Sequence, residues 1–296
     1  MRRRDHPDRA PAVTLDYHVV DVFTAQPFGG NPLAVVFGAD ELSTAQLQAL
    51  AREFNLSETV FPMPSTTPEA DYRLRIFTPG SEIPFAGHPS VGAAWVMHAL
   101  GRVGAGRVVQ ECGAGLLPLD VGPNRVVLTG GEPVVGEPVD TATVLAAVGL
   151  EPADAVGTPA RWCSTGLVFA FLHVHDDAMT RAAPDLTALA RLGNAGVSVF
   201  SYEAGRAHVR VFAAGVGVPE DPATGSAGLA LGVWLVDAGL LPGDGESSYL
   251  IEQGLEMGRP SRLECTVVAE GGRAQTCRVA GSVVPVAQGR IEVPPA

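Results

Sequence analysis

The sequence of 296 residues contains no lysine, since all 20 of its lysine or arginine positions are arginine. Without a lysine amine the chain can form no Schiff base with a substrate or with pyridoxal phosphate, and it can contain no P-loop. Arginines are also outnumbered by 32 acidic residues, which gives a formal net charge of −12. Because nucleic acids and anionic membranes bind basic surfaces, we expect neither as a partner.

Cysteines are few, and long hydrophobic runs are missing. Cys112, Cys163, Cys265 and Cys277 form no C-x-x-C pair, so neither a zinc knuckle nor a dithiol redox motif is present. The longest apolar stretch, residues 227–236, is ten residues long and interrupted by glycine, whereas a membrane helix needs roughly 20. The amino-terminal residues lack the apolar core of a secretory signal. We therefore expect a cytoplasmic protein with free thiols.

Two segments of the chain resemble each other at an offset of 139 residues. Residues 47–61 read LQALAREFNLSETVF, and residues 186–200 read LTALARLGNAGVSVF. Each is followed by an Arg-x-Phe triplet, a turn, and a glycine that opens a mostly apolar run, Gly87 or Gly225. A repeat of this length predicts two related halves, with a boundary in the Gly- and Pro-rich stretch 130–138.

Both halves contain the same kinds of predicted element. Short alternating or apolar segments are typical of strands: residues 17–23, 33–37, 71–77, 125–128, 167–173, 197–202, 207–212 and 262–268. A capping-box pattern at Ser43 predicts a surface helix over Thr44–Phe54. Two further helices, 89–100 and 226–238, are apolar nearly all round, which requires that each be enclosed.

These patterns predict an α+β fold of two pseudo-symmetric halves. Each half would consist of strands wrapped around a buried central helix. We expect residues 13–131 to form the first half, joined by a C-terminal strand within 281–296, and residues 132–280 to form the second. Residues 1–12 are expected to be a flexible tail.

Candidate site residues stand where the buried helices begin. His88 follows Gly87, and Asp221 shortly precedes Gly225 and Ser226. First-turn N–H groups lack partners within a helix, so two helix starts that meet in a cleft would attract an anion, most simply a substrate carboxylate. The glycines are equally compatible with ordinary turns, and the acid with an ordinary helix cap.

Glu58 breaks the symmetry of the repeat, because its counterpart at the offset of 139 is Val197. An ionisable residue in only one of two similar segments is a candidate for chemistry. A solvated carboxylate at a strand start would give the same pattern.

Four segments carry a resemblance to a known family. They are residues 55–59 (NLSET), 77–89 (FTPGSEIPFAGHP), 221–227 (DPATGSA) and 253–261 (QGLEMGRPS). In this order they resemble the signature segments of the phenazine-biosynthesis PhzF-like family, and the likeness runs from about Tyr17 to the C-terminus.

The resemblance implies a diaminopimelate-epimerase-like fold, in which each half is a barrel-like, mostly antiparallel sheet around a buried central helix and the site lies between the halves. It also implies a homodimer and a cofactor-independent isomerase, like the one that rearranges a dihydro-hydroxyanthranilate. By motif match, Glu58 would shuttle the proton, while His88 and Asp221 would position the substrate and assist protonation. Substrate hydrogen bonds, chiefly to its carboxylate, would come from Ser57, Gly87, Gly225 and Ser226.

This assignment is physically reasonable. A carboxyl group that takes and returns a proton works best with its pKa raised towards neutrality, which burial provides. His88 near Asp221 would form a pair whose ionisation can be tuned. Related epimerases use two cysteines, and because neither helix-start motif contains one, racemisation by a cysteine pair is disfavoured.

Three functions stay open at this point. The first is a cofactor-independent isomerase acting on a small carboxylate-bearing cyclic or amino-acid-like substrate. The second is an amino-acid epimerase or racemase on the same fold, and the third is a catalytically idle interaction module. We expect no metal, because His173 and His175 alternate on a predicted strand without a third ligand at suitable spacing.

Overall fold

The computed structural model describes residues 13–193 and 196–295, so the predicted tail, residues 1–12, lies outside the described residues. Strands dominate a mixed α+β fold, with the short 3-10 helices η1 (Pro152–Asp154) and η2 (Ala214–Val216) between them. The α-helices are α1 (Thr44–Phe54), α2 (Gly87–Ala99), α3 (Thr141–Ala147), α4 (Asp176–Met179), α5 (Leu186–Leu192) and α6 (Gly225–Asp237). The strands are β1 (Thr14–Val22), β2 (Asn31–Val36), β3 (Glu58–Met63), β4 (Tyr72–Phe77), β5 (Glu82–Ile83), β6 (Gly106–Cys112), β7 (Gly115–Val121), β8 (Val126–Thr129), β9 (Val134–Pro138), β10 (Arg161–Ser164), β11 (Val168–His173), β12 (Gly196–Glu203), β13 (Arg206–Ala213), β14 (Val218–Asp221), β15 (Gly245–Gln253), β16 (Ser261–Glu270), β17 (Arg273–Gly281) and β18 (Val283–Glu292).

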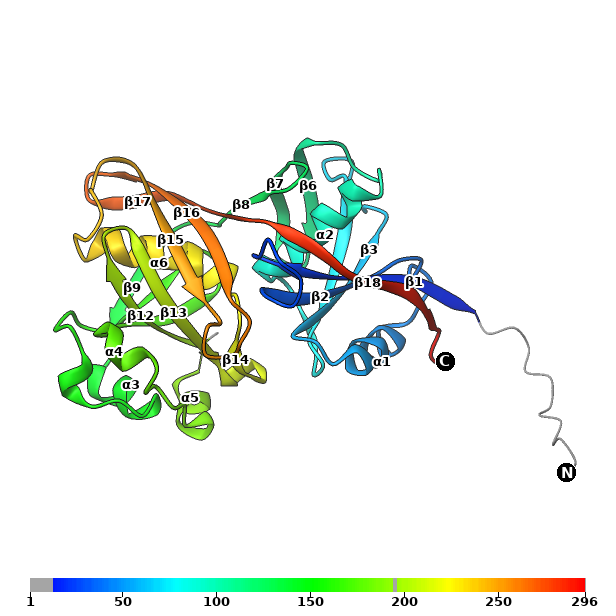
Figure 1. Cartoon of the computed structure of the whole chain (residues 1–296). Helices are drawn as coiled ribbons and strands as arrows, with labels where there is room; N and C mark the ends of the chain where they lie inside the picture. The colour runs from blue at the N-terminus through cyan, green and yellow to red at the C-terminus, as the bar shows by residue number, and fades with distance from the viewer. Residues whose placement is uncertain (1–12, 194–195, 296) are drawn as a thin grey trace, which may run out of the picture.

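Figure 1 shows two lobes, one around α2 and one around α6. In the α2 lobe, β1 pairs antiparallel with β18 and β2, β2 is parallel to β3, and β3 is antiparallel to β4. The strand β4 is parallel to β6, and β6, β7 and β8 follow as antiparallel neighbours. Because β18 lies next to β1, the two ends of the described chain share one lobe.

The α6 lobe is built from the middle of the chain. Here β10 pairs antiparallel with β9 and β11, β11 is parallel to β12, and β12 is antiparallel to β13. The strand β13 is parallel to β15, followed by antiparallel β16 and β17. Finally, β17 pairs with β8 of the other lobe, so one hydrogen-bonded sheet runs through both. The stretch 130–138, expected to be a boundary, contains β9.

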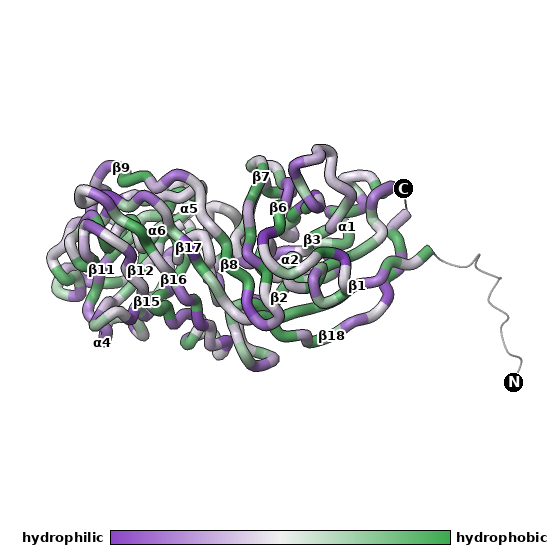
Figure 2. Tube along the Cα trace, turned by 90° about the horizontal axis from the view of Figure 1, so that it is seen from above, coloured by the Kyte–Doolittle hydropathy of each residue, from purple (hydrophilic) through white to green (hydrophobic). Residues whose placement is uncertain are grey.

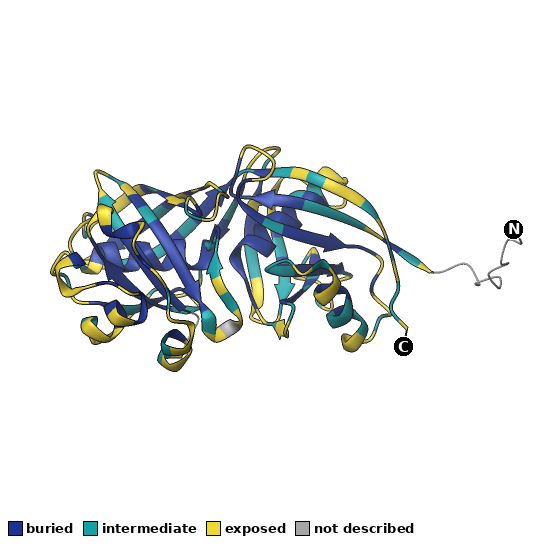
Figure 3. Ribbon diagram, turned by 60° about the horizontal axis from the view of Figure 1, so that its bottom comes forward, coloured by how far each residue is buried: buried dark blue, intermediate teal, exposed yellow. Residues whose placement is uncertain are grey.

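Both nearly all-apolar helices are enclosed, as predicted. Figure 3 shows buried residues in the interior of both lobes and exposed ones on loops and peripheral helices. In α6 every residue from Gly225 to Val236 is buried. In α2 a Cβ atom on Gly92 would lie 2.6 Å from Leu33 and 2.8 Å from Val22. Glycine therefore lets β1 and β2 pack directly on the helix.

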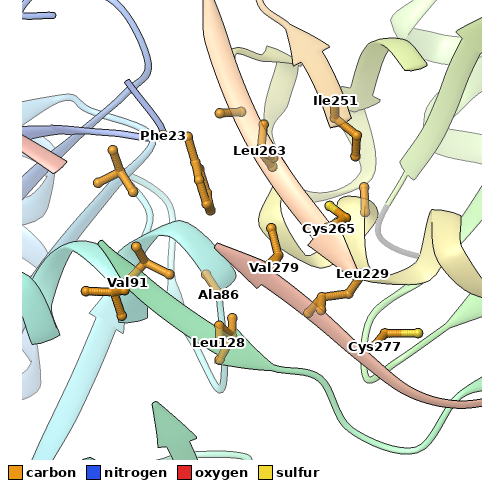
Figure 4. Close-up of a cluster of buried hydrophobic side chains, with 14 of the residues drawn as sticks. Phe23, Ala86, Val91, Leu128, Leu229, Ile251, Leu263, Cys265, Cys277 and Val279 are labelled. Atoms are coloured by element: carbon orange, nitrogen blue, oxygen red, sulfur yellow. The ribbon is translucent and has the colours of Figure 1, made fainter. Parts of the chain in front are cut away.

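One large hydrophobic cluster spans the two lobes. It includes Val91 of α2, Leu229 of α6 and Val279 of β17, and Figure 4 shows Phe23 and Leu128 in the same region. Hydrophobic residues follow the inner strands of both lobes in Figure 2. This shared core fixes the two helices relative to each other.

The surface helix α1 has the predicted bounds. Ser43 and Gln46 form the expected reciprocal capping box, and Asn55 ends the helix in the left-handed conformation, with φ of 50°. The predicted strands are all present, with ends that differ by a few residues. No helix in the described part of the chain is long and apolar enough to span a bilayer.

Candidate active site

The first turns of the two buried helices meet. A Cβ atom on Gly87, the first residue of α2, would lie 3.0 Å from the backbone nitrogen of Ser226 and 3.3 Å from Cα of Gly225. Only glycine permits so close an approach without displacement of the backbone. The positive ends of both helix dipoles therefore lie at one point.

Neither helix start is capped by a side chain. The N-cap residues Ala86 and Thr224 make no side-chain hydrogen bond to their first turns. Since the first four N–H groups of a helix have no partner within it, these starts keep free donors for a ligand. Two such N-termini side by side favour an anion.

A cavity of about 210 Å³ lies at this junction. Among the described residues its polar lining comes from Glu58, Thr78, His88, Asp221, Thr224 and Ser226, with Gly87 and Gly225 at the helix starts. Its apolar lining comes from Ile83, Pro84, Phe85, Ala86, Leu167, Phe169, Ala213 and Val218. The cavity thus combines an anion-binding end, titratable groups and an apolar wall.

The structure brings six of the seven predicted site residues to this cavity. Ser57 is the exception, because it is not among the described residues that line it. Glu58 begins β3 and lines the cavity, whereas Ser57 lies in the bend just before this strand.

Glu58 is held at the first position of β3 with 12% of its side chain exposed. Burial raises the pKa of its carboxyl group well above the usual value, and the negative charge of Asp221 raises that pKa further. A carboxyl group with a raised pKa both gives and takes protons near neutral pH.

His88 lies in the first turn of α2 and is 4% exposed. Burial lowers the pKa of its imidazole to about 3, while a hydrogen bond to the Pro32 carbonyl acts in the opposite direction. Its Nε2 atom lies 3.4 Å from Oε2 of Glu58. The imidazole is therefore neutral near pH 7 and faces the candidate proton carrier.

Asp221 is the last residue of β14. Burial raises its pKa to about 6, although hydrogen bonds from Thr224 and Asn31 partly offset this effect. His88 and Asp221 lie near each other, since Nδ2 of Asn31 is 3.1 Å from Nδ1 of His88 and 2.8 Å from Oδ1 of Asp221. The carboxyl group that His88 contacts directly is that of Glu58.

Asn31, which begins β2 after a turn rich in glycine, was not among the residues predicted for the site. Its Nδ2 atom lies 3.1 Å from Nδ1 of His88 and 2.8 Å from Oδ1 of Asp221. No periodicity marks such a residue, and its partner is 190 residues away. Only an asparagine beside Gly30, in the turn that leads into a strand, hinted at a special backbone position.

Gln253, in the segment 253–261 that carries part of the family resemblance, also supports the site. Its side chain accepts a hydrogen bond from the Thr224 backbone and donates one to the Asp221 carbonyl over 2.7 Å. In the same motif, Ser261 donates to the Pro222 carbonyl. The motif 253–261 therefore holds the loop that carries Asp221.

His173 lies in β11, and His175 lies beyond the end of that strand. Among the described residues, no group of three or more His, Cys, Asp or Glu side chains is arranged to hold a metal ion. All four cysteines are free.

Comparison with known proteins gives consistent similarities. The family model of the phenazine biosynthesis-like proteins matches residues 20–289. An uncharacterised isomerase of Mesorhizobium japonicum is 37% identical over 311 residues, covering 94% of this chain and 99% of the relative. The trans-2,3-dihydro-3-hydroxyanthranilate isomerase of Pseudomonas aeruginosa is 34% identical over 289 residues, covering 93% and 98%.

A solved structure is similar over the same extent. The crystal structure of the Bacillus anthracis phenazine biosynthesis protein of the PhzF family superposes with a TM-score of 0.85 at 26% identity, covering 94% of this chain and 99% of the other. Both the sequence comparison and the structural comparison therefore match this chain to phenazine biosynthesis-like proteins along nearly its whole length.

Proposed function

Because this chain belongs to the phenazine biosynthesis-like protein family and is an isomerase, we propose that it moves a proton on a small carboxylate-bearing molecule through the side chain of Glu58. The observation that carries this proposal is the burial of Glu58 in the cavity beside the two helix starts. A raised pKa there suits one carboxyl group to both halves of a proton transfer.

Each site residue has a role in this proposal. The first-turn N–H groups at Gly87, Gly225 and Ser226 bind the substrate carboxylate and hold the reacting carbon atoms near Glu58. Glu58 delivers a proton to one carbon atom and takes one from another, so that it ends in its starting state. His88 and Asp221 orient the substrate and support its protonation.

The lining of the cavity supports a substrate with one carboxylate and a mainly apolar body. No arginine is among the described residues that line it, and the chain has no lysine. The helix starts therefore supply the positive potential for one anionic group. In the same cavity, Leu167, Phe169 and Ile83 offer apolar contacts that suit a ring. The substrate of the Pseudomonas relative, a cyclic carboxylate, is the first molecule to test.

Two pseudo-symmetric halves of the diaminopimelate-epimerase-like type also belong to this proposal, with residues 13–131 and 281–296 in the first and 132–280 in the second. The strand pairings support it. From β2 to β8 the order of pairings is parallel, antiparallel, parallel, antiparallel, antiparallel, and from β11 to β17 it is the same.

The proposed enzyme is a cytoplasmic homodimer that needs no cofactor. Its family resemblance supports the dimer, and four free cysteines suit a reducing compartment. Acid–base groups in the cavity provide the proton transfer themselves. Light scattering of the purified protein tests the dimer, since a monomer at all concentrations contradicts it.

The experiment that tests the function is solvent-deuterium incorporation followed by NMR and mass spectrometry. The substrates are trans-2,3-dihydro-3-hydroxyanthranilate and a panel of amino-acid-like carboxylates. Wild type and Glu58→Gln are compared, with Glu53→Gln on the exposed face of α1 as a matched control. Rearrangement that is lost only in Glu58→Gln supports the proposal, whereas equal activity of all three proteins contradicts it. Deuterium entry with inversion at an α-carbon would instead identify an epimerase.

A further inference from the structure

We infer that Asn31 is a positioning residue: its side-chain amide holds Asp221 as the ionised member of the buried Glu58–Asp221 pair and so keeps the proton of that pair on Glu58. This inference rests on the proposed function, because it concerns the same two carboxyl groups.

Asn31 reaches the catalytic groups without reaching the cavity. It is fully buried, and it is not among the described residues that line the cavity. Its Nδ2 atom lies 2.8 Å from Oδ1 of Asp221, 2.9 Å from the Ala223 carbonyl and 3.1 Å from Nδ1 of His88. It therefore acts through Asp221, and it touches no substrate.

The orientation of the amide follows from its neighbours. The Ala223 carbonyl can only accept, so it must face the NH₂ group of Asn31. A flipped amide would place Oδ1 against this carbonyl and against the Asp221 carboxyl oxygen. The NH₂ group has two protons, and the two shortest contacts, to Ala223 and Asp221, use both of them.

The second oxygen of Asp221 is also an acceptor. The Thr224 hydroxyl donates to Oδ2 over 2.6 Å, and this hydroxyl itself accepts a bond from Nε2 of Gln253 over 3.0 Å. Because Gln253 donates to Thr224, the hydroxyl proton is free for Asp221. Both Asp221 oxygens thus receive donors, and a proton on either one would displace a hydrogen bond.

Glu58 has no comparable support. Its Oε2 atom is buried without a hydrogen-bond partner among the described residues, as is the facing Nε2 atom of His88. The burial that keeps His88 neutral also means that it offers Glu58 no positive charge. One negative charge in the pair is therefore better placed on Asp221, which leaves the proton on Glu58. Catalysis then begins with proton delivery to the substrate, and the resulting Glu58 carboxylate takes the second proton.

The test is a site-resolved titration by NMR of protein labelled with ¹³C at the Asp and Glu side-chain carboxyl groups. Glu58→Gln and Asp221→Asn assign the two signals. In wild type we expect Asp221 to ionise at a lower pH than Glu58. In Asn31→Ala the Asp221 titration should move up by about one unit, since a charge-assisted hydrogen bond is lost. Earlier ionisation of Glu58 in wild type, or an unmoved Asp221 titration in folded Asn31→Ala, overturns the inference.

Two further variants complete the experiment. Gln110→Leu removes another fully buried amide, bonded to Tyr72 and Ser90, and should leave Asp221 unmoved. Thr224→Val removes the other donor and should shift Asp221 upward like Asn31→Ala. If Asn31→Ala does not fold, the inference is tested by the order in which Asp221 and Glu58 ionise in wild type and by the Asp221 titration in Thr224→Val.

The titrations need no substrate, so their result is valid even if no isomerisation is found. Conversely, the proposed isomerase function is not contradicted if the titrations overturn the role of Asn31. With an active substrate, Asn31→Ala should lower kcat at least tenfold and leave KM within about twofold. A large rise in KM at unchanged kcat would contradict a positioning role.

Discussion

The Nε2 atom of His88 and the Oε2 atom of Glu58 lie 3.4 Å apart, and neither has a hydrogen-bond partner among the described residues. Both side chains are almost fully buried. Buried polar atoms without partners lower the stability of the fold by about 1–3 kcal/mol each. The fold thus keeps polar groups available at the cavity at the expense of stability.

Asp221 should contribute a free energy of unfolding that falls as the pH rises from about 4 to 6, whereas His88, with a pKa of about 3 in the fold, contributes in the opposite direction. The pKa of Asp221 is about 6 in the fold and about 3.9 in an unfolded chain, so the folded state binds the proton more tightly in this interval. Its contribution is complete below the unfolded pKa and is lost above the folded one. The difference corresponds to about 3 kcal/mol. Urea denaturation at several pH values should show that Asp221→Asn loses less free energy of unfolding than wild type over this interval, because the His88 contribution is present in both proteins. Equal losses would contradict the buried, protonated state.

Gly87→Ala should weaken substrate binding. Its Cβ atom would lie 3.0 Å from the Ser226 nitrogen and separate the two helix starts. We expect KM to rise about tenfold or more, because the helix N–H groups would no longer converge on the carboxylate. Gly80→Ala is the control, since its Cβ atom would meet only Thr78 at 3.8 Å. Unchanged binding in Gly87→Ala would show that the carboxylate binds elsewhere.

Gly92→Ala should destabilise the protein although alanine is the better helix former. Its Cβ atom would meet Leu33 at 2.6 Å and Val22 at 2.8 Å, in strands packed on α2. Overpacking of this kind costs about 1–3 kcal/mol, more than the ~1 kcal/mol gained in helix propensity. Gly228→Ala in α6 meets Ile251 at 3.2 Å and should cost less. Thermal denaturation of both variants measures the difference in stability. A Tm of Gly92→Ala above that of Gly228→Ala would refute the prediction.

Arg259→Met should destabilise the fold strongly. Arg259 pairs with the buried carboxylate of Asp21 and also donates to the carbonyls of Gly29 and Gly30, just before Asn31. Loss of one partner of a buried pair costs about 3–5 kcal/mol. A double-mutant cycle with Asp21→Asn should show strong coupling. The exposed pair Arg290–Asp16 should show less than about 1 kcal/mol, and similar coupling for both pairs would contradict the argument.

Local signals in the sequence predicted the elements well. The helix Thr44–Phe54 has its predicted bounds because Ser43, Gln46 and Asn55 form its caps within a few residues. The buried helices were predicted from apolar residues on every side, and they begin at or just before the predicted position, at Gly87 and Gly225.

These local signals could not predict contacts between segments that are distant in the sequence. Asn31 and Asp221 meet across 190 residues, and no pattern near either one indicates the other. For the same reason the contact between His88 and Glu58 was missed. Ser57 lies just before β3 and does not line the cavity, which the motif match could not indicate.

The pairing of β18 with β1 sets an order of events during synthesis. Thr14 lies opposite Glu292 in this ladder, so β1 can form this pairing only after the residues of β18 have been made. The strands β9 to β17 are complete earlier and can pair while β1 still lacks this neighbour. Closure of the α2 lobe is therefore a late step that joins distant segments. The edge of β1 stays uncovered for as long as the intervening chain is being translated.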